Sequence, residues 1–166
     1  MKVKENIANN VKGKTPSESA VEMTELVLPN DVNLLGNLLG GRLMHWIDIA
    51  GAMAASRHSN KIVATVALDS LDFRHPVRVG QFVILKAKLT WVGRTSMEVK
   101  VDVFGEDFKT GEIIQTNKAY VTFVALDENG RPTPVPPLIP ETEEEKKDYV
   151  EAQKRREERL ARRESN

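Results

Sequence analysis

The chain has 166 residues and no cysteine, and its 24 Lys and Arg balance its 24 Asp and Glu. This length favours one compact domain with appendages, and the lack of cysteine excludes disulfides, a thiolate nucleophile and cysteine-based zinc sites. The balanced charge argues against nucleic-acid or anionic-membrane recruitment, and no signal core or run of ~20 apolar residues is present, so we expect a cytoplasmic protein.

Residues 1–18 are polar, and we expect them to form a flexible N-terminus. Residues 19–28 follow as a first predicted strand, which ends at Pro29. Next comes a glycine-bearing turn that leads directly into an apolar segment, where we expect a helix over residues 41–58. Apolar side chains lie nearly all round this helix, so it is expected to be wrapped by other structure.

One carboxylate, Asp48, stands on this otherwise apolar helix. An acid in such a place is costly unless it is paired or used. Glycines at the helix start allow another group to approach the backbone, and the unpaired amides of the first turn can hold an oxygen that bears negative charge. Asp48 follows Gly41 by about two helical turns. Its carboxylate is therefore expected on the same face of the helix as the open N-terminal turn at Gly41, which we call the helix mouth, and roughly 10 Å along the axis from it.

Most of the remaining domain is predicted to be strand. Residues 62–73 are mostly apolar, which is typical of a strand buried on both faces, while residues 82–91 and 97–103 alternate apolar and polar side chains. The short link between these two segments predicts a hairpin, and residues 112–126 supply a fifth strand. One long helix among five largely antiparallel strands indicates the α+β class.

The end of the chain changes character. Residues 128–141 are rich in proline, which predicts an extended linker. Residues 142–166 then predict a charged C-terminal helix, with Thr142 as its N-cap and Glu145 completing a capping box. Acids in its first turn and arginines later match the helix dipole. We expect this helix to be solvated.

Several of these segments resemble the hotdog-fold acyl-CoA thioesterases, in the branch of the cytosolic brain-type acyl-CoA hydrolase and its short bacterial relatives. The resemblance rests on residues 36–48 and continues through residues 62–73, 92–99 and 134–143, so that it covers about residues 19–160. It implies a hotdog fold over residues 19–127, with the antiparallel sheet wrapped around the central helix. It also implies hydrolysis of fatty acyl-CoA to free fatty acid and CoA.

The resemblance further implies roles for individual residues. Asn37 and Asp48 fall at the family's catalytic positions, and the amides near Gly40 and Gly41 would form the oxyanion hole. Asp48 would deprotonate the attacking water or attack the thioester directly, and the sequence leaves both routes open. Contacts to CoA are implied at Thr65, Arg94, Thr95 and Ser96. No metal or organic cofactor is implied.

The resemblance and the long apolar strand together predict self-association. A strand over residues 62–73 at the sheet edge would pair with its own copy, and closed symmetric oligomers are the usual result. We expect a homo-oligomer, with the dimers assembling into a trimer of dimers, a hexamer, and Asn37 acting across a subunit boundary.

Other interpretations of the helix segment are weaker. Gly36 and Gly41 have P-loop spacing, but Arg42 and Leu43 replace the Lys and Ser/Thr that bind phosphate. His45 and Asp48 could be two metal ligands, yet no third ligand stands nearby in sequence. The chain also has no Gly-x-Ser-x-Gly elbow for a serine hydrolase.

Alternatives stay open both for the roles of single residues and for the function of the whole protein. Asp48 could be a structural acid paired with Arg42, His45 or a backbone donor, Asn37 could be only a turn residue, and residues 94–96 could be only a polar turn. The whole protein could be a non-catalytic acyl-CoA-binding hotdog protein, or a structural scaffold. A hotdog dehydratase would need a catalytic histidine before the helix, whereas the chain has His75-Pro76 at the end of a strand.

Overall fold

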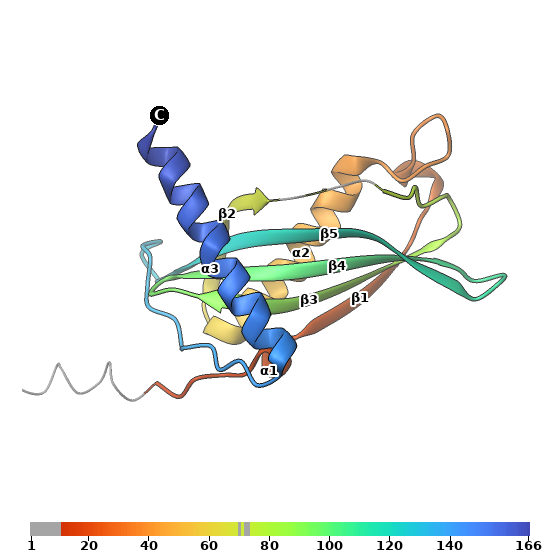
Figure 1. Ribbon diagram of the computed structural model, residues 1–166. Helices are drawn as coiled ribbons and strands as arrows, with labels where there is room; N and C mark the ends of the chain where they lie inside the picture. Colours follow the sequence, from red (N-terminus) through yellow and green to blue (C-terminus); the bar gives the residue numbers. More distant parts are fainter. Residues whose placement is uncertain (1–10, 70, 72–73) are drawn as a thin grey trace, which may run out of the picture.

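The computed structural model describes residues 11–69, 71 and 74–166, which form a five-stranded sheet with one long helix on each face (Figure 1). The strands are β1 (Val21–Leu26), β2 (Ile62–Asp69), β3 (Phe82–Val92), β4 (Ser96–Asp107) and β5 (Glu112–Leu126). Their order across the sheet is β1-β3-β4-β5-β2, and every neighbouring pair is antiparallel. The predicted α+β class, the hairpin between β3 and β4 and the fifth strand are confirmed.

The helix α2 (Gly40–Ser59) covers one face of the sheet and forms the core with it. Ile47, Ala50 and Ala54 on α2 are fully buried. Small residues let the sheet approach closely: a Cβ added to Gly51 would lie 2.9 Å from the Phe123 ring. The helix ends at Asn60, whose left-handed backbone (φ 57°) forms the C-cap. The predicted central helix is therefore confirmed, within one residue at each end.

The strand predicted at residues 62–73 differs from expectation. The structure has a strand only over Ile62–Asp69, and residues 70 and 72–73 lie outside the described part of the chain. β2 is an edge strand that pairs with β5 on one side. Ile62 is 77% exposed and Val66 47% exposed, so the prediction of burial on both faces is wrong for the single chain. An edge strand has a neighbour on one side only, and its apolar side chains remain uncovered.

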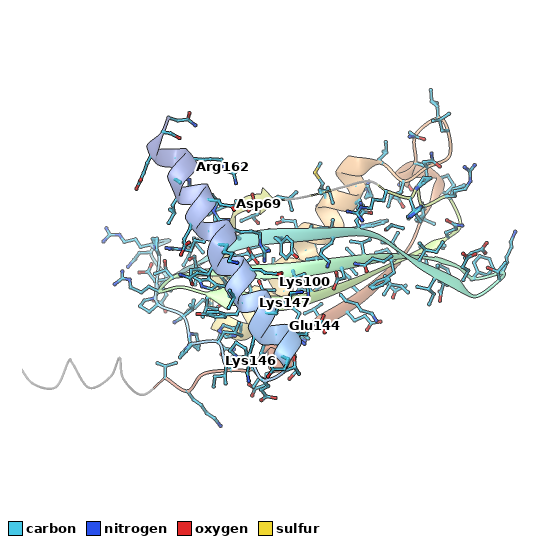
Figure 2. All side chains as sticks on the ribbon, in the orientation of Figure 1. Asp69, Lys100, Glu144, Lys146, Lys147 and Arg162 are labelled. Carbon is cyan, nitrogen blue, oxygen red and sulfur yellow. The ribbon has the colours of Figure 1, made fainter. Side chains whose placement is uncertain are left out.

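The C-terminal helix α3 (Glu143–Glu164) begins as predicted, because the Thr142 hydroxyl accepts a hydrogen bond from the Glu145 amide at 3.1 Å. The helix is solvated on one side only, however, with Glu145 and Ala152 buried. α3 lies across the sheet face opposite α2, as Figures 1 and 2 show. Its contacts with the sheet include ion pairs to strands β4 and β2: Asp148–Lys100 at 2.6 Å, Arg155–Glu98 at 2.8 Å and Arg159–Asp69 at 2.9 Å.

Alternating polar residues on β4 therefore face a charged helix instead of water. Glu98 is 3% exposed and Lys100 8% exposed, although each is a charged residue of the kind that usually marks a solvent face. Such groups are buried only when they are paired, and α3 supplies the opposite charges.

The segments that flank the sheet are also held by hydrogen bonds. The predicted first strand is shortened to β1, and a short helix α1 (Pro16–Ser19) precedes it. The proline-rich segment is extended, as predicted: the Val135 amide donates to the Arg94 carbonyl at 2.9 Å, and Pro136 accepts from the buried His58 ring at 2.8 Å. This segment thereby runs along the β3–β4 hairpin to the start of α3.

Candidate active site

The turn over residues 33–39 delivers the chain into α2. The Asn33 amide donates to the Asn37 carbonyl at 2.9 Å, and the Gly36 amide donates to the Asn33 carbonyl at 3.0 Å. Gly36 has a φ of +80°, a conformation that glycine adopts at little cost. The Asn33 side chain reinforces the turn, because its Oδ1 accepts from the amides of Leu35 at 2.9 Å and Asn37 at 3.2 Å. Its Nδ2 has no acceptor within the described residues.

Asn37 faces a second loop that closes over this turn. Its backbone forms a bridge with Arg78, and its Oδ1 accepts from Arg78 Nη1 at a long 3.4 Å. The Val79 amide also donates to the Gly36 carbonyl at 3.0 Å. These contacts place an arginine side chain beside the helix mouth.

The mouth of α2 is open. Leu39 is the N-cap, and no side chain of the described chain caps the first turn. The amides of Gly40 and Gly41 have no acceptor within the described residues, as expected for the first turn of a helix. A Cβ added to Gly41 would meet no atom within 4 Å. The structure therefore presents two unpaired amides beside free space, an arrangement that can hold an oxygen bearing negative charge.

Asp48 lies two turns further along α2 and is half-buried. Its Oδ1 accepts a hydrogen bond from the hydroxyl of Thr65 on β2 at 2.6 Å. The structural partners considered from sequence are not the ones observed. Arg42 pairs with Asp31 at 3.1 Å, and His45 is exposed at the helix surface. A carboxylate held by one short hydroxyl donor keeps lone pairs free for a water molecule.

Thr65 was expected to contact CoA, and its hydroxyl lies at the Asp48 carboxylate. The other expected CoA residues are Arg94 and Thr95 in the β3–β4 turn and Ser96 at the start of β4. Backbone carbonyls of this turn bond to distant segments of the same chain, since the Thr95 carbonyl accepts from the Ala125 amide on β5 at 3.0 Å. The Arg94 side chain is exposed. Within one chain this hairpin lies at the opposite end of the sheet from the mouth of α2 (Figure 1).

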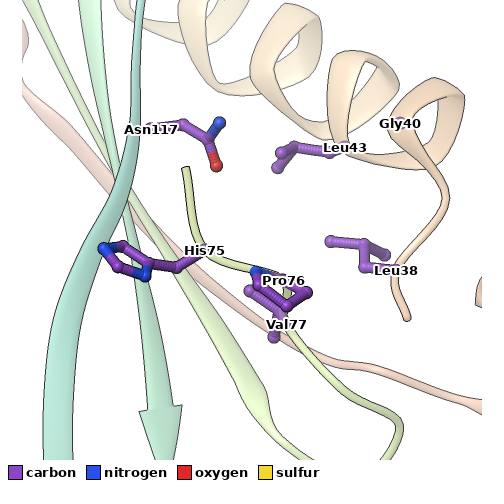
Figure 3. A pocket seen from close by; sticks show the side chains of 7 residues that line it. All are labelled: Leu38, Gly40, Leu43, His75, Pro76, Val77 and Asn117. Atoms are coloured by element: carbon purple, nitrogen blue, oxygen red, sulfur yellow. The ribbon is translucent and has the colours of Figure 1, made fainter. Parts of the chain in front are cut away.

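A cavity of about 370 Å³ opens beside the helix mouth. Figure 3 shows Leu43 from α2 and Asn117 from β5 facing each other across it, with His75 on the β5 side and Gly40 at the opposite end. Its lining is mostly apolar and comprises Leu38, Gly40, Leu43, His75, Pro76, Val77 and Asn117. Sequence reasoning missed this cavity, because its walls come from three segments far apart in the chain.

Two classes of site receive no support within the described residues. No cluster of three or more His, Asp or Glu is placed there to hold a metal ion. In the same part of the chain, no helix is long and apolar enough to cross a membrane.

Comparison with known proteins identifies the family. A model of the thioesterase superfamily matches residues 35–112. A Bacillus subtilis protein described as an uncharacterized acyl-CoA thioester hydrolase is 45% identical over 128 residues, which make up 77% of this chain and 74% of that protein. The chain belongs to the thioesterase superfamily. Its five-stranded sheet around a central helix is the hotdog fold of that superfamily, so the predicted family and fold are confirmed.

Solved thioesterase structures are similar over nearly the whole chain. An apo-hexameric acyl-CoA thioesterase is 41% identical with a TM-score of 0.88, and the match covers 92% of this chain and 97% of that one. An acyl-CoA hydrolase from Staphylococcus aureus, solved with butyryl-CoA, CoA and CoA disulfide, is 37% identical with a TM-score of 0.85 and coverage of 92% and 93%.

The Staphylococcus aureus hydrolase has also been solved as three single alanine variants. They replace an asparagine, an aspartate and a threonine, which follow one another in that order along the chain. The asparagine variant is in complex with CoA.

Proposed function

We propose that the protein hydrolyses acyl-CoA thioesters to a free carboxylic acid and CoA. The observation that carries this proposal is the Asp48–Thr65 pair, 2.6 Å apart, on a helix whose mouth presents unpaired amides. A thioester needs a base for the attacking water and donors for the developing oxyanion, and it needs no strong acid because a thiolate is a good leaving group.

Each step of the reaction uses a group of this chain. The carbonyl oxygen binds at the amides of Gly40 and Gly41, which polarise it and hold the negative charge of the tetrahedral intermediate. A donor of this type is worth on the order of 10²–10³ in rate. Asp48 takes a proton from water as the oxygen attacks the carbonyl carbon. The C–S bond then breaks, and the thiolate of CoA leaves with the electron pair.

Thr65 positions the base in this scheme. Its hydroxyl occupies one side of the Asp48 carboxylate, which orients the carboxylate and leaves its remaining lone pairs for water. The alternative route, attack by Asp48 itself, forms an acyl anhydride. Single turnover in ¹⁸O-water distinguishes the two, because hydrolysis of an anhydride at its carboxylate carbon leaves label in Asp48, whereas direct water attack labels only the product acid.

The asparagine of the site is proposed to be Asn33. The sequence intervals that separate Asn33, Asp48 and Thr65 equal those between the three replaced residues of the Staphylococcus aureus hydrolase, whereas Asn37 stands too close to Asp48 to match. The Nδ2 group of Asn33 is available to bind the water or the thioester. Asn37, which the sequence suggested for this role, is proposed to fix the turn together with Arg78.

A dimer would complete the site. The exposed side of β2 carries Ile62, Val66 and Leu68, and the neighbouring face of α2 exposes Ile49 and Met53. Pairing of two β2 strands about a two-fold axis is antiparallel and covers these side chains. It also turns the partner's 94–96 hairpin toward this protomer's helix mouth. We propose that Arg94, with Thr95 and Ser96, contacts the phosphates of CoA bound across this interface.

The proposed assembly is a trimer of such dimers, in line with the hexameric thioesterase to which the chain is similar. Sedimentation at micromolar protein is expected to give a species of about six times the 18.6 kDa chain mass. A monodisperse monomer would contradict both the proposed assembly and the proposed site formed by two subunits. No cofactor is required by the proposed chemistry, and a cytoplasmic location remains a prediction.

The experiment that tests the activity is a panel of acyl-CoA substrates from acetyl to palmitoyl, with release of free thiol as the readout. Turnover that exceeds the spontaneous rate and is lost in Asp48→Asn supports the proposal. Tight acyl-CoA binding without thiol release would favour the second candidate, a non-catalytic acyl-CoA-binding protein on the same fold.

A further inference from the structure

Arg42 stands in the first turn of α2, where cations are disfavoured. The helix dipole stabilises negative charge at this end of a helix, yet the first turn of α2 carries no acidic residue. The partner of Arg42 comes from outside the helix, because its Nε lies 3.1 Å from Oδ1 of Asp31. A residue that breaks a local rule in this way is often found where a function requires it.

Asp31 is a buried carboxylate, only 6% exposed, that also holds two other segments of the chain. Its Oδ2 accepts a hydrogen bond from the Leu28 amide at 2.9 Å, and its backbone carbonyl accepts from the Leu39 amide at 2.9 Å. Leu39 is the N-cap of α2. The backbone of Asp31 therefore closes the loop over residues 31–39, and its side chain ties this loop to the first turn of α2.

The loop closed by Asp31 carries groups that the proposed reaction uses. Asn33 lies near its start, and Gly40 and Gly41 follow directly after its end. Among the described residues, no atom would lie within 4 Å of a Cβ at Gly41, so packing does little to hold the helix mouth in place. Oxyanion donors act only at the correct distance from the developing charge, and a misplacement of about 1 Å can cost about 10²-fold in rate.

We propose that Asp31 is a positioning residue for the reaction, an inference that rests on the proposed thioesterase function. Its carboxylate contacts Leu28 and Arg42, and it does not contact Asp48. It acts through Arg42 and Leu39, which hold the amides of the helix mouth in the orientation that the oxyanion requires. The pair of Asp31 and Arg42 is neutral as a whole, so it places no uncompensated negative charge beside the oxyanion.

Asp31→Asn tests the proposal, because it keeps the shape of the side chain and removes the charge that pairs with Arg42. The substrate is the acyl-CoA that the wild-type protein hydrolyses fastest. We expect kcat to fall tenfold to a hundredfold, while KM and the Kd of CoA stay within twofold of the wild-type values. Such a split is expected when an interaction is lost mainly in the transition state.

Glu98→Gln is the matched control. Glu98 is also a buried carboxylate paired with an arginine, but it lies on the sheet face that α3 covers. Its replacement should lower the melting temperature and leave kcat unchanged in an assay well below that temperature. If Asp31→Asn likewise loses only stability, the role of Asp31 is structural and the positioning role is wrong.

Arg42→Gln tests the same pair from its more exposed side, and it does so even if Asp31→Asn does not fold. It leaves a buried negative charge beside the helix mouth, so kcat should fall at least tenfold. Adding Asp31→Asn to Arg42→Gln removes that charge, and the double variant should be no slower than Arg42→Gln alone. A double variant whose loss is the product of the two single losses would show that the two residues act independently and would overturn the proposal.

Hydrogen exchange gives a readout that does not depend on turnover. The Leu39 amide donates to the Asp31 carbonyl, and the Leu43 amide donates to the Leu39 carbonyl at 3.1 Å. Asp31→Asn should speed exchange of both amides at least tenfold, whereas Glu98→Gln should leave it unchanged because a helix end opens locally.

The outcomes separate this inference from the function on which it rests. If the wild-type protein releases no thiol from any acyl-CoA, the proposed function fails. If it turns over acyl-CoA but Asp31→Asn matches Glu98→Gln in kcat and in exchange at Leu39, the proposed function stands and only the positioning role of Asp31 is wrong.

Discussion

The carboxylate of Asp48 offers the sharpest test of the proposed mechanism. Asp48→Asn keeps the shape of the side chain and keeps an oxygen that can accept the 2.6 Å hydrogen bond from Thr65. It removes the negative charge and the ability to take a proton from water. Loss of a general base typically costs ~10²–10⁴ in rate, so kcat should fall by that factor. Binding of CoA should be retained, because the proposed phosphate contacts lie on the 94–96 hairpin.

The structure also sets the expected effect on stability. Arg42 pairs with Asp31, so no ion pair is lost when Asp48 becomes neutral. The hydrogen bond from Thr65 changes from charged to neutral, which is worth about 1 kcal/mol. For a chain of this size, that corresponds to a melting temperature about 2–4 °C lower. A large loss of kcat with a small loss of stability is therefore the signature of the catalytic role.

Asp148→Asn is the matched control for this experiment. Asp148 also accepts a 2.6 Å hydrogen bond, but from Lys100 under α3, far in sequence from the proposed site. Its neutralisation leaves a buried ammonium without its charged partner, so stability should fall by more than in Asp48→Asn while kcat is unchanged. Thiol release, CoA binding and melting temperature should be measured on the same preparations. If Asp48→Asn turns over at near wild-type rate, Asp48 is neither the base nor the nucleophile.

Three further predictions concern stability. Arg155→Met leaves the 3%-exposed Glu98 carboxylate without its cation and should lower the free energy of unfolding in urea by about 3–5 kcal/mol. The double variant Arg155→Met with Glu98→Leu should recover most of that loss, and equal losses in the single and double variants would contradict this prediction. Burial lowers the pKa of His58 below its usual 6.5, and the nearby positive charge of Lys14 acts in the same direction. Below about pH 6.5 the unfolded chain therefore binds a proton more readily than the native chain, and the free energy of unfolding should decline as the pH falls. His58→Gln should flatten this decline. Gly51→Ala forces a Cβ to 2.9 Å from the Phe123 ring and should cost about 1–3 kcal/mol; an unchanged melting temperature would show that the ring moves freely.

Local sequence signals were sufficient for several elements of this fold. The capping pattern at Thr142 predicted the start of α3, and the hydroxyl of Thr142 does cap it. The period-two pattern and short link predicted the β3–β4 hairpin, and the apolar run with small residues predicted α2. Each of these signals lies within a few neighbouring residues, where the identity of the side chains directly favours one backbone conformation.

The candidate site was only partly predictable in the same way. Asp48 stood out because an acid on an apolar helix needs a partner or a use. Its observed partner, Thr65, lies on another element, and no local pattern identifies it. The turn at residues 33–37 offers two asparagines, and composition alone does not choose between them. The cavity depends on Asn117, which only the pairing of β5 with the rest of the sheet brings opposite Leu43.

The sequence by itself determined the helix, the strand pattern, the acid and the glycines, because periodicity, capping and turn chemistry act over short stretches of chain. Only the tertiary structure decided which surfaces are covered. The alternation in β4 predicted that Glu98 faces water, yet α3 buries it, since opposite charges far apart in the sequence meet there. The apolar run of β2 predicted burial, yet β2 lies at the sheet edge, since order across a sheet depends on contacts between distant segments.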